Sequence, residues 1–312
     1  MDRIVDIATD KVHLSAHRGL LLVALDGEEM GRVALDDIAA VIVHAHGVTW
    51  TTNLVVKLAE RGAMMVLCAA NHAPVAMMVP VEGHHAQNAR FRAQWDAGLP
   101  FRKRAWQAVV QAKIRNQGSL LTALGREEGQ ALMPMAERVK SGDTANAEAQ
   151  AARRYWPALM GKEFRRDRDV DGANSLLNYG YTVMRAAVAR AAIAAGLHPT
   201  IGLHHANRLN AFALADDLVE PFRPLVDAAV HQMVEEGMGE LDGPAKARLA
   251  SLLSADLDLQ GSTTPANLAI QRLAQSLAAS FEQGRVELAL FQTPAPLAWN
   301  AIARHVPDGE MR

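Results

Sequence analysis

Short hydrophobic runs fill the first part of the chain. They are rich in β-branched residues or leucine, and turn signals such as Asp26-Gly27 separate them, which is typical of strands. The predicted strands are RIVDIAT, KVHLSAH, GLLLVAL, AAVIVHAH and MMVLCA. Between the last two, residues 51–62 have apolar positions at helical spacing, so they predict one short helix that ends at Gly62.

Longer helical patterns replace the strands after about residue 81. Residues 81–88 are polar and contain glycine, which favours a linker. The predicted helices are 101–125, 145–160, 174–195, 207–220, 224–237, 244–254 and 264–283, the last opened by STTP. We therefore predict an α+β protein with a small β-rich N-terminal domain (1–80), a linker region (81–98) and a larger all-α domain (99–312).

The composition is that of an ordinary globular protein, with 50% hydrophobic and 21% charged residues in a chain of 312. No apolar run approaches the roughly 20 residues of a membrane helix. The first residues include Asp2 and Asp6 and lack the apolar segment of a signal peptide, so we expect a cytoplasmic protein. The single cysteine, Cys68, sits in an apolar run, which favours a buried inert thiol.

Basic residues are concentrated in two stretches, although the net charge is only -2 and argues against a protein that coats nucleic acid indiscriminately. The stretches are 90–115 and 153–169. Either one alone is most often a solvated face, but two that flank a candidate acidic site favour contacts with phosphate. The candidate DNA-binding residues are Arg102, Lys103, Arg104, Lys113, Arg153, Arg154, Arg165 and Arg166.

An acidic segment follows a histidine pair in GLHHANRLNAFALADDLVEPFRPLVD. On a continuous helix, Asp216, Asp217 and Glu220 share one face, and either His204 or His205 could supply a nitrogen. Carboxylates suit magnesium or manganese, and an added imidazole fits manganese better than calcium. The alternative is a solvated acidic face beside a histidine with a structural role.

A further acid, Glu148, lies one turn before an apolar helical face that includes Tyr155 and Trp156. An acid in such a place is costly unless it is paired or binds a cation, which makes Glu148 a third candidate ligand. By contrast, Tyr179 and Tyr181 are expected in the core. Asn174 and Asn178 are expected to be caps or packing contacts.

The chain resembles the CRISPR-associated endonuclease and integrase of the spacer-adaptation module, in the form that accompanies type II systems. The motifs that carry the resemblance are WQAVVQAKIRNQ, EAQAARRYW, DGANSLLNYGYTVMRAAVARA, GLHPTIGLHH and ADDLVEPFRPLVD. The resemblance implies a β-rich dimerisation domain followed by a helical catalytic domain. It implies Glu148, His205 and Glu220 as the catalytic metal ligands, with Asp217 as an auxiliary acid.

The resemblance also implies an activity in antiviral defence. The 3′-hydroxyl of a short duplex would attack a phosphodiester at the leader–repeat boundary, with Mg²⁺ or Mn²⁺ as cofactor. The implied partners are DNA, a second copy of the chain, and a small ferredoxin-like adaptation protein that completes a heterohexamer, with other type II components as further candidates. The alternatives are a non-catalytic DNA-binding scaffold of the adaptation complex and a metal phosphohydrolase for small nucleotides.

Overall fold

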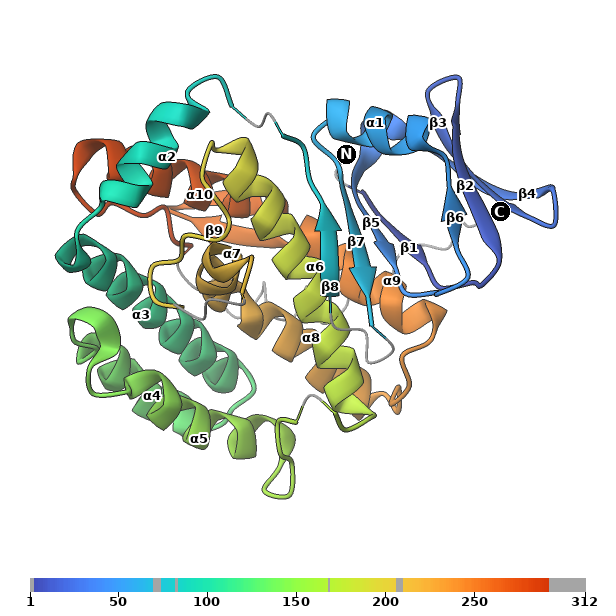
Figure 1. The fold of residues 1–312 in the computed structure, drawn as a ribbon. Helices are drawn as coiled ribbons and strands as arrows, with labels where there is room; N and C mark the ends of the chain where they lie inside the picture. The colour runs from blue at the N-terminus through green and yellow to red at the C-terminus, as the bar shows by residue number, and fades with distance from the viewer. Residues whose placement is uncertain (1–2, 70–73, 82–83, 168, 206–209, 292–312) are drawn as a thin grey trace. The chain divides into compact units, whose positions relative to one another are not determined.

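The computed structural model describes residues 3–69, 74–81, 84–167, 169–205 and 210–291 (Figure 1). The chain divides into two compact units, Met1–His85 and Ala86–Arg312. The first is rich in strands and the second is mostly helical, which confirms the predicted α+β class. No helix in the described ranges is long and apolar enough to cross a membrane.

The N-terminal unit contains two four-stranded sheets, with strand orders β1-β5-β7-β8 and β4-β3-β2-β6. In the first, β1, β5 and β7 are parallel, and in the second, β2, β3 and β4 form an antiparallel meander. The strands are β1 (Arg3–Ile7), β2 (Val12–His17), β3 (Leu20–Leu25), β4 (Glu28–Ala34), β5 (Ile38–Val43), β6 (Thr49–Trp50), β7 (Met64–Cys68) and β8 (Pro74–Met78). The remaining elements are η1 (Leu35–Asp37) and α1 (Thr52–Glu60).

Local sequence accounts for most of this unit. Asp26 and Gly27 both have positive φ, so the Asp-Gly pair makes the tight turn that joins β3 to β4, as predicted. Every residue of β5 is buried, which fits the continuous apolar run of a central parallel strand. Strand β4 was not predicted, because its sequence EEMGRVA is polar and mostly exposed.

The C-terminal unit is a helical assembly with one β-hairpin. Its α-helices are α2 (Gln87–Asp96), α3 (Leu99–Ala123), α4 (Glu128–Glu137), α5 (Ala147–Met160), α6 (Ala173–Ala194), α7 (Ala213–Leu218), α8 (Arg223–Glu235), α9 (Gly243–Ser251) and α10 (Ala266–Gln283). The shorter elements are η2 (Ser141–Asp143), η3 (Glu220–Phe222), η4 (Leu252–Ser254), β9 (Asp256–Leu259) and β10 (Ser262–Pro265). Helix α3 packs against α4, α5, α7 and α8, and α6 packs against α7, α8, α9 and α10.

Three local expectations differ from the structure. Helix α2 lies inside the segment 81–98, which was predicted as a linker region. The STTP segment forms strand β10 rather than the start of a helix, so the unit is not purely helical. The acidic helix ends at Leu218, and Glu220 begins a separate 3₁₀ turn, because Pro221 disfavours continued α-helix before it.

Helices α6 and α8 approach each other closely at Gly180. A Cβ added there would lie 2.4 Å from Val226 Cγ1 on α8 and 3.3 Å from Leu249 Cδ2 on α9. Gly180 therefore sets the distance between these helices, at the cost of a helix-weakening glycine.

We expect Gly180→Ala to destabilise the protein by about 1–3 kcal/mol, because the added methyl group overpacks the contact with Val226. Urea unfolding would measure the change. The control is Gly239→Ala, where a Cβ meets nothing within 4 Å. In the double variant Gly180→Ala/Val226→Ala the loss should be smaller than the sum of the two single losses, and strict additivity would contradict the explanation.

Candidate active site

Glu148 lies in the first turn of α5, and the preceding segment fixes its position. The buried carboxylate of Asp143 accepts hydrogen bonds from the backbone N–H groups of Ala147 (2.7 Å) and Glu148 (3.0 Å). These groups have no partner within the helix, so Asp143 stabilises the helix start that carries Glu148. The Glu148 side chain is 30% exposed, and its Oε1 accepts a hydrogen bond from Lys113 Nζ at 2.6 Å.

Glu220 is buried in η3, and two cations contact it. Arg223 Nε donates to Oε1 at 2.8 Å, and Lys113 Nζ lies 2.5 Å from Oε2. Asn116 on α3 donates its amide to the carbonyl oxygen of Pro221 at 2.8 Å, which fastens this turn to α3. The predicted ligands Glu148 and Glu220 therefore meet at one ammonium group, that of Lys113.

The pKa values of this cluster reflect competition between burial and charge. Burial alone would lower the pKa of Lys113, but the carboxylates of Glu220 and Glu148 together outweigh it and raise that pKa. Burial alone would raise the pKa of Glu220, but Arg223 and Lys113 reduce it to about 2. Near neutral pH the lysine is charged and Glu220 is ionised.

His205 belongs to the loop after α6, and Asp217 holds that loop. Asp217 is fully buried, and its Oδ2 accepts the backbone N–H groups of Leu203 (2.5 Å) and His204 (3.0 Å). Its Oδ1 accepts the backbone N–H of His205 at 3.3 Å and contacts the ring Nδ1 of His205 at 2.6 Å. A proton on Nδ1 satisfies this contact, which leaves Nε2 as the nitrogen that can bind a metal.

The close packing around Asp217 has two consequences. The hydrogen bond to Asp217 raises the pKa of His205, and burial opposes this shift. A Cβ at Gly202 would lie 2.8 Å from both Asp217 Oδ2 and the carbonyl oxygen of His205, so only glycine fits there. Both oxygens of Asp217, which was predicted as an auxiliary ligand, are engaged by the loop that carries His205.

The histidine pair packs on Trp106 of α3. The His204 ring stacks on the buried indole, with ring centroids 4.5 Å apart and planes 2° apart. The His205 ring meets the same indole edge-on at 5.8 Å. Trp106 and Lys113 are two turns apart on one face of α3, so this helix contacts both the histidine loop and the two acids.

Asp216 does not belong to the cluster. Arg185 Nε and Nη2 donate to its two oxygens at 2.5 and 3.0 Å, and Asn210 Nδ2 donates to Oδ2 at 2.6 Å. The expectation that Asp216, Asp217 and Glu220 share one face is therefore wrong. Asp216 and Asp217 are neighbours in α7 and meet different partners, whereas Glu220 lies beyond the end of α7, in η3, where it meets Lys113.

The donor set of two carboxylates and a neutral imidazole suits Mg²⁺ or Mn²⁺. Glu220 Oε2 supports this fit, because it is buried and already faces a cation, the Lys113 ammonium at 2.5 Å. Among the same residues, no three His, Cys, Asp or Glu side chains are gathered closely enough to hold a metal ion. In this arrangement the Lys113 ammonium lies between the two acids.

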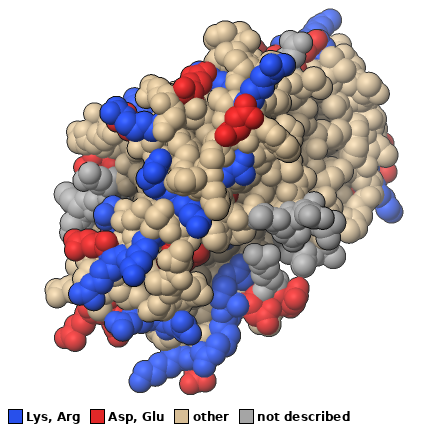
Figure 2. Space-filling view, turned by 60° about the vertical axis from the view of Figure 1, so that its left-hand side comes forward, with Lys and Arg blue, Asp and Glu red and all other residues tan. Residues whose placement is uncertain are grey.

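The candidate DNA-binding residues fall into two groups. Arg102 donates to the carbonyl oxygens of Gln94 and Trp95, and Arg165 donates to those of Lys162 and Phe164. Arg166 donates to the side chains of Asn174 and Asn178, which were expected to be caps or packing contacts. The exposed members are Lys103, Arg104, Arg153, Arg154 and Arg165, and Lys113 lies in the cluster with Glu148 and Glu220. Figure 2 shows Lys and Arg side chains gathered in the lower left of one face of the molecule.

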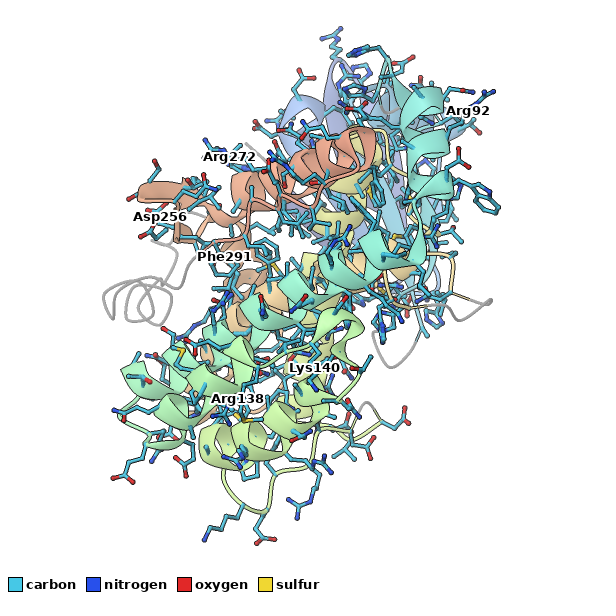
Figure 3. The ribbon with its side chains drawn as sticks, turned by 90° about the vertical axis from the view of Figure 1, so that its left-hand side faces the viewer. Arg92, Arg138, Lys140, Asp256, Arg272 and Phe291 are labelled. Carbon is cyan, nitrogen blue, oxygen red and sulfur yellow. The ribbon has the colours of Figure 1, made fainter. Side chains whose placement is uncertain are left out.

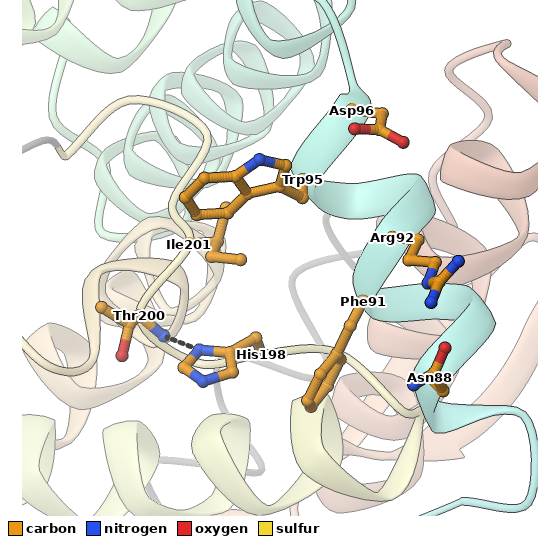
Figure 4. Close-up of a pocket in the computed structure, with 8 residues that line it drawn as sticks. All are labelled: Asn88, Phe91, Arg92, Trp95, Asp96, His198, Thr200 and Ile201. Carbon is orange, nitrogen blue, oxygen red and sulfur yellow. Dashed lines mark hydrogen bonds between the residues drawn. The ribbon is translucent and has the colours of Figure 1, made fainter.

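Helix α2 supports the histidine loop from its other end. Gln94 is fully buried; its Nε2 donates to the carbonyl oxygens of His198 (3.0 Å) and Ile201 (2.8 Å), and its Oε1 accepts the His198 N–H at 2.8 Å. A recess of about 430 Å³ lies beside this contact (Figure 4). It is lined by Asn88, Phe91, Arg92, Trp95, Asp96, His198, Thr200 and Ile201.

The buried carboxylate of Asp227 on α8 connects this helix to α5 and α6. Tyr155 of α5 donates to Asp227 Oδ2 at 2.8 Å, and Tyr181 of α6 donates to Oδ1. The guanidinium of Arg223 lies 4.5 Å from the centre of the Tyr181 ring. Sequence reasoning expected Tyr181 in the core, which is correct, but it missed Asp227 and Arg223. Both residues lie in the EPFRPLVD segment, directly after Glu220, and this position could have identified them as neighbours of the site.

The buried Asp227 predicts a specific pH dependence of stability. Burial raises its pKa from 3.8 to about 6, despite the opposing tyrosine hydrogen bonds. The unfolded chain therefore loses this proton first, and the contribution of Asp227 to stability falls between about pH 4 and pH 6. In the wild type, this contribution should lower the free energy of unfolding by about 1–3 kcal/mol across that pH range, and Asp227→Asn should abolish the decrease. Urea unfolding at several pH values would measure it. The exposed control Asp169→Asn should keep the wild-type profile, and an unchanged profile in Asp227→Asn would contradict the assignment.

Comparison with known proteins identifies the family of the chain. A sequence model described as "CRISPR associated protein Cas1" matches residues 5–255. The chain is 36% identical to the CRISPR-associated endonuclease Cas1 of Neisseria meningitidis serogroup C over 269 residues, which is 85% of this chain and 88% of that protein. It is 29% identical to a CRISPR-associated endonuclease Cas1 of Pyrobaculum aerophilum over 290 residues, or 87% and 97% of the two chains.

Two solved structures share the fold. One is a casposase bound to integration product, with a TM-score of 0.76, 20% identity, and coverage of 92% of this chain and 93% of that one. The other is a Cas6-RT-Cas1–Cas2 complex, with a TM-score of 0.75, 17% identity, and coverage of 94% of this chain and 36% of that one. The match to the family model and the identity to the Neisseria protein together show that the chain belongs to the Cas1 family of CRISPR-associated proteins.

Proposed function

We propose that this chain is a divalent-metal-dependent DNA endonuclease and integrase that inserts new spacers into a CRISPR array. The observation that carries the proposal is the convergence of Glu148 and Glu220 on one cation, with His205 oriented by Asp217 beside the same helix. Family membership supports the DNA substrate, since the Neisseria relative is named an endonuclease.

In the proposed reaction, the 3′-hydroxyl of a short duplex attacks a phosphodiester of the array. A new phosphodiester bond forms, the target P–O bond breaks, and the proton of the attacking hydroxyl is balanced by one gained at the leaving oxygen. Glu148, Glu220 and His205 Nε2 would hold Mg²⁺ or Mn²⁺. The bound ion would neutralise charge on the phosphodiester and lower the pKa of the attacking hydroxyl.

The residues of the chain would have separate tasks. Asp217 fixes the His205 ring and its tautomer, and Arg223 holds Glu220 ionised and in place. Exposed arginines such as Arg153 and Arg154 would bind the phosphate backbone of the DNA. A neutral imidazole adds a ligand without adding negative charge next to the DNA.

The proposed assembly contains a second copy of this chain and a small ferredoxin-like partner in a heterohexamer. Insertion of both ends of one duplex needs two active sites at a fixed distance, which a symmetric assembly supplies. A solved structure with the same fold is titled a Cas6-RT-Cas1–Cas2 complex, which supports a Cas partner protein.

We expect Glu220→Gln to reduce strand joining by at least about a thousandfold, because an amide is a far weaker metal ligand than a carboxylate. The measurement is transfer of a labelled duplex into an array fragment with Mn²⁺. The matched control is Glu163→Gln, an exposed acid in the same unit. Full activity of Glu220→Gln would contradict its role as a metal ligand. No strand joining by the wild type would favour the non-catalytic scaffold, and hydrolysis of free nucleotides without strand joining would favour the phosphohydrolase.

We expect the double variant Arg153→Gln/Arg154→Gln to bind DNA several-fold more weakly, since both exposed side chains would lose phosphate contacts. The slope of log affinity against log salt should become shallower by up to about 2, one for each lost contact. Fluorescence anisotropy at several salt concentrations would measure this. The control is Arg272→Gln on α10, outside both basic stretches (Figure 3). Equal slopes for the double variant and the wild type would show that these two arginines do not contact DNA phosphates.

A further inference from the structure

Lys113 lies where a bridging cation would be expected. Its ammonium is 2.6 Å from Glu148 Oε1 and 2.5 Å from Glu220 Oε2, and only 11% of its side chain is exposed. Glu220 Oε1 is taken by Arg223 at 2.8 Å. The oxygens that face Lys113 are therefore those that a metal would use, because the second oxygen of Glu220 is already engaged.

The charges of the cluster balance without a metal. Two carboxylates face one lysine and one arginine, so the acids do not repel each other in the resting protein. A divalent ion on the same oxygens would add two positive charges within a few ångströms of the ammonium. Like charges this close in a nearly buried site repel strongly, so the lysine and the metal cannot both occupy this position.

The lysine has a way out of the cluster. Its four-carbon side chain is flexible, so the ammonium can leave while α3 stays in place. Glu148 is 30% exposed, whereas Glu220 is 6% exposed, so the cluster meets solvent on the Glu148 side. Substrate phosphate would approach from that side, and a released ammonium would find a new partner there.

We propose that Lys113 is a resident counter-cation that a divalent metal displaces, and that the displaced ammonium pairs with a phosphate of the bound DNA. This inference rests on the proposed metal-dependent function. Metal binding then makes the Lys113 ammonium available to contact DNA. DNA binding, in turn, draws this competing cation away from the two acids. By linkage, each ligand strengthens the binding of the other by the same factor. Lys113 neutralises the acids of the site while no metal is bound, and it couples metal binding to the presence of DNA.

The first test measures Mn²⁺ binding without DNA, by electron paramagnetic resonance, in the wild type, Lys113→Met and Lys140→Met. Lys140 is an exposed lysine past the end of α4 (Figure 3), so its variant controls for the loss of one positive charge. We expect Lys113→Met to bind Mn²⁺ about tenfold more tightly or better, because the competing charge is gone. An equal or weaker affinity would overturn the proposal.

The second test repeats the titration with a duplex that lacks 3′-hydroxyl groups, so that no joining occurs. DNA should tighten Mn²⁺ binding in the wild type and in Lys140→Met, and clearly less in Lys113→Met. If DNA tightens Mn²⁺ binding equally in the wild type and both variants, the proposed coupling through Lys113 is wrong. Unfolding curves in Mn²⁺-free buffer check the fold, and Lys113→Gln, which keeps a hydrogen-bond donor, replaces Lys113→Met if that variant does not fold.

The proposed function fails in a different way. If the wild type and Glu148→Gln bind Mn²⁺ equally weakly, the metal site itself is refuted. If Glu148→Gln loses Mn²⁺ but Lys113→Met matches the wild type, the metal site stands and the role of Lys113 is refuted.

Discussion

The ion pairs of Lys113 with Glu148 and Glu220 are the interaction on which the polar centre of the helical unit depends. They join α3 to the start of α5 and to the turn before α8, three segments far apart in the sequence. Charges with so little exposure are expensive to desolvate, so such a cluster contributes little net stability while it is complete. Its contribution is to specify one arrangement, because removal of one partner leaves an uncompensated charge.

Helix α3 is the common support of the site. Trp106 packs against both histidines, Lys113 meets both acids, and Asn116 holds the backbone at Pro221. These three residues follow helical spacing, so one rigid element fixes their relative positions. The two supports of the His205 loop, Gln94 and Asp217, lie on other elements. Gln94 therefore holds the loop at His198 and Ile201, Asp217 holds it from Leu203 to His205, and the two histidines pack against α3.

Periodicity predicted the element types where side chains are sorted by burial. The wholly buried β5 and the long helices α3 and α6 follow directly from their apolar patterns, whereas the polar strand β4 and the short helix α2 do not. Helical spacing could not rank the acids, because the break at Pro221 separates Glu220 from Asp216. The resemblance selected Glu148, His205 and Glu220, whereas Lys113 was predicted from the charge pattern as a DNA-binding residue and not as a partner of the two acids.

The long sequence separation within the cluster has a consequence for folding and synthesis. Lys113, Glu148, Glu220 and Arg223 are contributed by segments that emerge at different times, and the last pair completes the centre. Contacts of this range form late and only as the intervening helices dock, because each one closes a long loop. An incomplete or misfolded chain therefore lacks the assembled acid pair. In a protein proposed to cut and join DNA, this arrangement would confine the reaction to fully folded molecules.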